Sequence, residues 1–366
     1  MKSLSKILNS NISQQLFYLL VLVLFLRIDL VFENNTPTGG DMGAHIVAID
    51  TFIKDFMPNL QINGWSNDWF GGYPLYYFYF PLPAIITYIL NLVFSFGIAF
   101  KIMVVMSTIL VVYSIEKLMR KTSNQISIYG ATAGLFYVFT ESFTIYGGNL
   151  ASTLAGQFSF AYSLAFANLS IFYLIKSKNN FRFTISSIFL ALCLLSHLIP
   201  FIIYSPIYAF YWLSKKQNLN QRILSIFIFL ALASRWTTSL LMNLEYTTNM
   251  SYTPFSRLDD LIKKDILPII FILIGLLIAK HKNLIKNKTL NLFDFYIISS
   301  SILLYFYVPE GALWNGRLVP FFNLGIIFLF FKAVEIFIDD INLYQQGVNV
   351  LTGLFLGGTI YCLSLI

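Results

Sequence analysis

The sequence predicts an all-α membrane protein, a polytopic bundle of about ten or eleven transmembrane helices with a long first extracytoplasmic loop. The 366 residues are 57% hydrophobic and 11% charged, and the mean hydropathy is +0.71, whereas a soluble domain carries about 25% charged residues. Apolar runs of about 20 residues recur from Gln15 to the end of the chain. In lipid each run must be helical, because its backbone groups find no water to bond.

Charge and cysteine usage narrow the class of protein further. The formal net charge is +7, but Lys and Arg fall in short clusters between apolar runs, which indicates the positive-inside pattern rather than a nucleic-acid surface. We therefore expect residues 1–366 to form one transmembrane domain in the cell membrane, with a cytoplasmic N-terminus. Cys193 and Cys362 lie in apolar segments, which excludes a disulfide framework. Because the chain stops at Ile366 within an apolar stretch, the sequence leaves open that it is part of a longer protein.

The basic clusters set the expected topology, since each should face the cytoplasm. Residues 33–83 then form the extracytoplasmic first loop, and the short run 84–96 lies along the outer interface or as a re-entrant piece. Residues 183–213 are too long for one span and read as a hairpin of short helices that turns at residues 196–200. The acidic segment 335–340 is expected in a cytoplasmic loop. The full spans are expected at residues 16–32, 98–115, 129–143, 161–175, 223–241, 266–279, 293–307, 318–331 and 348–366.

The first loop carries the first candidate functional residues. Its segment "TGGDMGAHIVAIDTFIKDF" places apolar side chains at helical spacing above polar ones, which predicts an amphipathic helix along the membrane surface. Asp41 stands at the start of this helix, where it could cap the backbone or act as a catalytic carboxylate. His45 follows one turn later on the same face, as an interfacial polar residue or as a ligand.

Aromatic residues crowd the end of the same loop. The stretch "WSNDWFGGYPLYYFYFPLP" is typical of an aromatic belt at the membrane interface, and it could also stack against a sugar. Asp68, between Trp65 and Trp69, is a weaker candidate for binding substrate.

Ionisable groups near membrane depth are a sharper signal, because each costs about 3 kcal/mol on insertion scales. Arg235 and Arg317 fall near the expected outer ends of helices, where a guanidinium fork suits a phosphate group. Snorkelling explains Arg235 equally well. His197, at the apex of the expected hairpin, is a candidate for substrate binding or for capping a helix. The full set is Arg27, Asp29, Glu141, His197, Arg235, Glu310 and Arg317, of which Arg27 and Asp29 are expected to pair or snorkel.

Five motifs in this order resemble a known family: "GGDMGAH", "GGYPLYYFYFPLP", "GGNLASTLAGQFSFAYSLAF", "SHLIP" and "WNGRLVPF". The sequence resembles the membrane proteins labelled 6-pyruvoyl-tetrahydropterin synthase-related, which in turn are similar to the GT-C class of lipid-dependent glycosyltransferases. The sequence lacks the zinc-binding histidine cluster of the soluble pterin enzyme from which that family takes its label.

The resemblance implies transfer of a sugar from a polyprenyl-phosphate donor to an acceptor at the extracytoplasmic face. Asp41 matches the essential acid of the class and would be the general base. Arg317, with Arg235, would hold the leaving phosphate, and His45, Asp68 and His197 are the remaining substrate-binding candidates. Related sequences often carry an acid at the position of Gln157. No tightly held metal or other cofactor is expected. Some members of the class use a divalent metal, and Asp41, His45 and Asp68 are the candidate ligands for one here.

Two other functions stay open from the sequence. A lipid or solute transporter is the non-enzymatic alternative, although ionisable residues gather near the outer face rather than at the bilayer midplane. The other is an inactive relative of the GT-C enzymes. This alternative stays open because Gln157 stands where related sequences often carry an acid. Membrane lipids are partners in every case.

Overall fold

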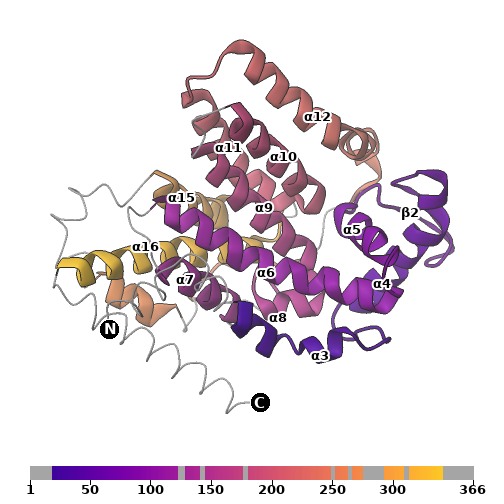
Figure 1. The fold of residues 1–366 in the computed structure, drawn as a ribbon, viewed down its shortest axis with the longest axis horizontal. Coiled ribbons are helices and arrows are strands. Elements are labelled where there is room, and N and C mark those ends of the chain that lie inside the picture. Colours follow the sequence, from indigo (N-terminus) through magenta and orange to yellow (C-terminus); the bar gives the residue numbers. More distant parts are fainter. Residues whose placement is uncertain are drawn as a thin grey trace.

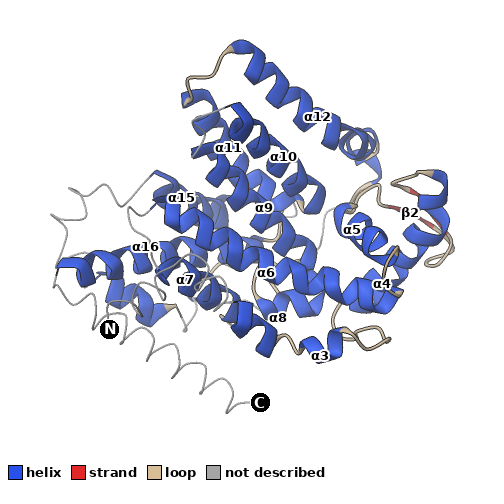
Figure 2. Ribbon diagram, viewed as in Figure 1, coloured by secondary structure: helices blue, strands red, loops and turns tan. Residues whose placement is uncertain are grey.

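A computed structural model describes residues 19–122, 128–140, 145–175, 180–248, 252–262, 266–274, 292–308 and 313–340. The chain is a bundle of helices with one small strand pair (Figures 1 and 2), which confirms the predicted fold class. Among the described residues, four helices are long and apolar enough to cross a membrane: Phe96–Arg120, Leu150–Ile175, Leu219–Met242 and Asn315–Val334. The expected span 348–366 lies outside the described residues.

The helices follow the predicted apolar runs closely. The expected first span contains α3 (Ile28–Val31). The first loop holds α4 (Met42–Thr51), the π-helix η1 (Phe52–Phe56), the 3-10 turn η2 (Met57–Asn59), β1 (Gly64–Ser66) and β2 (Tyr73–Leu75), and α5 (Leu82–Asn91) follows it. The bundle continues with α6 (Phe96–Thr122), α7 (Ile128–Phe139), α8 (Leu150–Ser152), the π-helix η3 (Thr153–Gln157), α9 (Phe158–Ile175), α10 (Asn180–Ser196), α11 (Leu198–Ser214) and α12 (Leu219–Met242). Then come η4 (Leu244–Tyr246), α13 (Leu258–Leu261), α15 (Leu292–Tyr307), η5 (Asn315–Leu318) and α16 (Val319–Asp340).

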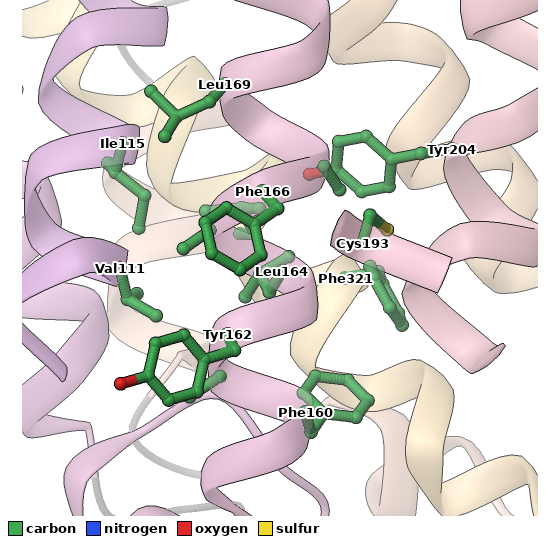
Figure 3. Close-up of a cluster of buried hydrophobic side chains, with 14 of the residues drawn as sticks. Val111, Ile115, Phe160, Tyr162, Leu164, Phe166, Leu169, Cys193, Tyr204 and Phe321 are labelled. Carbon is green, nitrogen blue, oxygen red and sulfur yellow. The ribbon is translucent and has the colours of Figure 1, made fainter. Parts of the chain in front are cut away.

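Helix α9 is the centre of the bundle. Nearly every one of its side chains is buried, which is expected of a helix that is apolar on all sides and surrounded by others. Figure 3 shows its aromatic and aliphatic side chains between those of α6, α10, α11 and α16. By contrast, few side chains of α12 are buried. In a membrane its exposed apolar face is the face that lipid covers.

Polar side chains tie the central helices together. Tyr204 on α11 donates to Asn168 on α9 at 2.6 Å, and Asn168 in turn donates to Ser114 on α6 at 3.2 Å. All three are fully buried. Hydrogen bonds of this kind contribute about 0.6 kcal/mol each between membrane helices, so they set the register of the bundle more than its stability.

The expected hairpin at residues 183–213 is confirmed. Helix α10 ends at Ser196 and α11 begins at Leu198, and His197 between them is extended. The Nδ1 atom of His197 accepts a hydrogen bond from the backbone N–H of Ile199 at 3.2 Å, so the side chain caps α11 in the way the sequence left open. Arg27 and Asp29 also form the expected pair, at 2.7 Å.

The first loop departs from the all-helical expectation in one place. Strands β1 and β2 pair antiparallel, with Trp65 opposite Pro74, and two strands of three residues are too short to give an alternating sequence pattern. The turn between them needs Gly71 and Gly72, whose φ angles of 74° and 118° few other residues adopt. Lys101 on α6 holds the start of the loop by donating to the backbone carbonyls of Leu30 and Glu33, each at 2.6 Å.

Helix α16 is longer than predicted. It continues to Asp340, so the segment 335–340, expected as an acidic loop, is helical. Lys332 on α16 forms a fully buried ion pair with Asp294 on α15, and pairing is what makes buried charge tolerable in a membrane bundle.

Candidate functional site

A cavity of about 1080 Å³ lies where the first loop meets the ends of the central helices. Four of the predicted site residues line it: Asp41, His45, His197 and Arg317. Gln157 lines it too. Most of the remaining wall is aromatic, with Trp69, Tyr73, Tyr76 and Tyr79 from the first loop and Tyr252 and Trp314 from the C-terminal part of the described chain. Part of the predicted aromatic belt is thus the wall of a site.

Asp41 begins α4 but does not cap it. Its side chain makes no capping hydrogen bond, and its backbone N–H donates to the carbonyl of Ala155 on η3 at 3.0 Å. The two segments touch closely because Gly156 faces Asp41, and a Cβ at Gly156 would lie 2.9 Å from that of Asp41. Gly156 also has a φ of 104°, which favours glycine for a second reason. The carboxylate therefore faces the cavity instead of the helix backbone.

A chain of hydrogen bonds joins Asp41 to Arg317 through Gln157. Nη1 of Arg317 donates to Oε1 of Gln157 at 2.7 Å, and Nε2 of Gln157 donates to Oδ2 of Asp41 at 3.3 Å. The three residues come from η5, η3 and the start of α4. A carboxylate and a guanidinium thus stand on either side of one neutral amide.

Arg317 is held from one side only. Its Nη1 also donates to the carbonyl of Tyr146 at 3.2 Å, while no described residue accepts a hydrogen bond from its Nε or Nη2. Asn315 fixes the turn that precedes Arg317: its side chain accepts from the N–H of Phe255 at 2.9 Å and donates to the carbonyl of Phe255 at 2.7 Å. Two of the three guanidinium nitrogens of Arg317 are therefore left to bind an anion in the cavity.

The two histidines differ in their surroundings. The ring of His45 packs on Phe158 and Tyr79, with centroids at 4.8 Å and 5.5 Å. Burial lowers the pKa of His45, and the charge of Asp41 opposes this effect, so the imidazole is neutral at neutral pH. The ring of His197 stacks on Phe80 at 4.6 Å and keeps its capping bond, which leaves it a wall residue of the cavity.

Asp68 and Arg235 do not line the cavity. Asp68 accepts hydrogen bonds from the hydroxyls of Thr51 and Ser66, and the bond from Thr51 is the main cause of its lowered pKa. Arg235 donates to the carbonyl of Leu60 at 2.9 Å. The structure thus gives both residues a place in holding the first loop rather than in the site.

The donor set of the cavity fits a divalent cation poorly. Such cations bind several oxygen ligands, yet Asp41 is the one carboxylate among the described residues of the cavity wall. The side-chain oxygen of Gln157, Oε1, already accepts from Arg317. No group of three His, Cys, Asp or Glu side chains that could hold a metal occurs in the described part of the chain.

Comparison with known proteins supports the fold. No protein-family model and no curated protein sequence matches the chain, so the family resemblance stays a prediction. Among solved structures, it is similar to ArnT from Cupriavidus metallidurans bound to undecaprenyl phosphate, at 12% sequence identity and a TM-score of 0.50. The match covers 89% of this chain and 61% of that one.

The fold of this chain is therefore similar to that of ArnT. The chain spans about three-fifths of the length of that relative, since 61% of it is covered. At this identity the likeness describes the fold alone.

Proposed function

We propose that the protein is a glycosyltransferase that takes a sugar from a polyprenyl-phosphate donor and transfers it to an acceptor hydroxyl at the extracytoplasmic face. One observation carries the proposal: Asp41 and Arg317 face the same aromatic cavity and are linked by Gln157. The fold likeness to ArnT, which was solved with undecaprenyl phosphate, supports the lipid class of the donor. The motif resemblance to the 6-pyruvoyl-tetrahydropterin synthase-related membrane family is consistent with it.

The chemistry would be a single inverting displacement. The acceptor oxygen attacks the anomeric carbon while the bond from that carbon to the phosphate oxygen breaks, and the electron pair of that bond leaves with the phosphate. Asp41 takes the proton of the attacking hydroxyl. Arg317 stabilises the negative charge that grows on the phosphate.

Reconstitution tests the proposal. The purified protein in proteoliposomes is given a panel of radiolabelled polyprenyl-phosphate sugars together with a membrane extract as the acceptor source. We expect one donor to yield labelled product and free polyprenyl phosphate in equal amounts, with no loss of rate in EDTA because the described residues of the cavity wall include a single carboxylate. Movement of an intact donor across the bilayer without cleavage would instead show a transporter, and no reaction with any donor would favour the inactive relative.

The proposal also requires the cavity to face outward. Asn67 is exposed in the first loop, and Asn220 is exposed at the start of α12, beside the basic cluster that we expect in the cytoplasm. We expect an impermeant thiol reagent to label Asn67→Cys in intact cells, and Asn220→Cys only after permeabilisation. Labelling of the protein without an added cysteine gives the background from the natural cysteines. The reverse pattern would place the site on the cytoplasmic side and contradict a donor at the outer leaflet.

A further inference from the structure

Gln157 occupies a position between the two charged groups of the site. Arg317 can only donate hydrogen bonds, so the oxygen of the amide must face it and the nitrogen must face Asp41. Oδ2 of Asp41 then accepts the hydrogen bond from the amide nitrogen. The arginine thus orients the amide, and the amide in turn orients the carboxylate.

We propose that Gln157 is a positioning residue that aims the Asp41 carboxylate and prevents it from pairing directly with Arg317, an inference that rests on the proposed function. A direct carboxylate–guanidinium pair is bidentate and strong. It would occupy the oxygen that receives the acceptor's proton and the nitrogens that hold the phosphate. A neutral amide between them holds both groups in place and leaves their charges available.

The backbone around Gln157 is fixed independently of its side chain. Gln157 ends the π-helix η3 and α9 follows at once. The preceding Gly156 and Ala155 hold the start of α4 by close packing and by the hydrogen bond from the N–H of Asp41. Replacing the side chain of Gln157 therefore changes the two side-chain hydrogen bonds and leaves the contact between these segments.

A glutamate at this position has a defined electrostatic consequence. Among the described residues, the charged or titratable groups that face Asp41 are His45 on α4, Tyr79 after β2 and Arg317 on η5. Gln157→Glu adds a negative charge within hydrogen-bonding distance of Asp41, and a like charge makes a carboxylate harder to ionise. The new carboxylate would also pair with Arg317 and compete with the phosphate of the donor.

The test compares Gln157→Glu and Gln157→Met with the wild type in the reconstituted transfer assay. For Gln157→Glu, we expect the acid side of the pH–rate profile to move up by about one pH unit and the affinity for undecaprenyl phosphate to fall about tenfold. For Gln157→Met, which keeps the size and loses both hydrogen bonds, we expect kcat to fall about tenfold with donor affinity retained. Gln61→Glu is the control, since it adds the same charge at an exposed position of the first loop outside the cavity.

A merely structural role predicts something else. It would lower the midpoint of thermal unfolding and the amount of active protein, and leave the pH profile of the remaining activity unchanged. If the wild type transfers the sugar, an unshifted pH–rate profile in Gln157→Glu or a wild-type kcat in Gln157→Met would overturn this inference. Absence of transfer by the wild type itself would instead overturn the proposed function, so the two failures are distinguishable.

Discussion

Asp41→Asn should lower the rate of sugar transfer by roughly a hundredfold or more, because an amide cannot take the proton of the attacking hydroxyl. The swap is nearly isosteric, and the amide oxygen can still accept from Nε2 of Gln157. We therefore expect wild-type insertion, unfolding temperature and affinity for undecaprenyl phosphate. The measurement is the single-turnover rate of transfer at saturating donor.

The structure also changes the loss of stability that we expect for Asp41→Ala. Loss of a helix cap costs about 1 kcal/mol, but the Asp41 side chain makes no capping bond, so the free energy of unfolding should fall by less than that. Asp55→Asn is the matched control, since Asp55 is exposed on η1 in the same loop and outside the cavity. Wild-type transfer by Asp41→Asn would rule out the proposed mechanism, whatever the fold.

The sequence predicts the bundle well because membrane helices follow a strong local rule. A long apolar run must be helical in lipid, and α9, α12 and α15 each begin and end within a few residues of the expected run, while α6 covers its run and continues to Thr122. Even the break at His197 was predictable, since a run that is too long for one span and contains Pro200 suggests a turn. The extension of α16 through 335–340 was missed because the predicted span ended with its apolar run at residue 331, whereas the helix continues past that run.

The site was predictable only one residue at a time. Asp41 and Arg317 each stand out by position, the first after two glycines and the second near the end of an apolar run. Their connection through Gln157 spans 116 residues on one side and 160 on the other, and no local pattern encodes such a contact. It depends on a π-helix and on the left-handed backbone of Gly156. Arg235, equally charged but within α12, contacts a loop carbonyl instead.

Arg317→Lys should weaken binding of undecaprenyl phosphate by about tenfold, because it keeps the charge and loses the planar fork. The guanidinium uses Nη1 on Tyr146 and Gln157 and keeps two nitrogens for an anion. An ammonium group donates from a single nitrogen and lacks the planar spacing of the fork, so it cannot reach Tyr146, Gln157 and the phosphate as well as the guanidinium does. Arg317→Gln removes the charge as well, and its loss of affinity should exceed that of Arg317→Lys.

Native mass spectrometry of the purified protein with added undecaprenyl phosphate measures this loss directly, without knowledge of the sugar or the acceptor. Arg235→Lys is the control, since it makes the same change at an exposed arginine outside the cavity and should bind the lipid as the wild type does. Because Arg317 also stabilises the leaving phosphate, the transfer rate of Arg317→Lys at saturating donor should fall too. Equal weakening by Arg235→Lys and Arg317→Lys would mean that the lipid is held by general surface charge, and wild-type binding by Arg317→Lys would place the phosphate elsewhere.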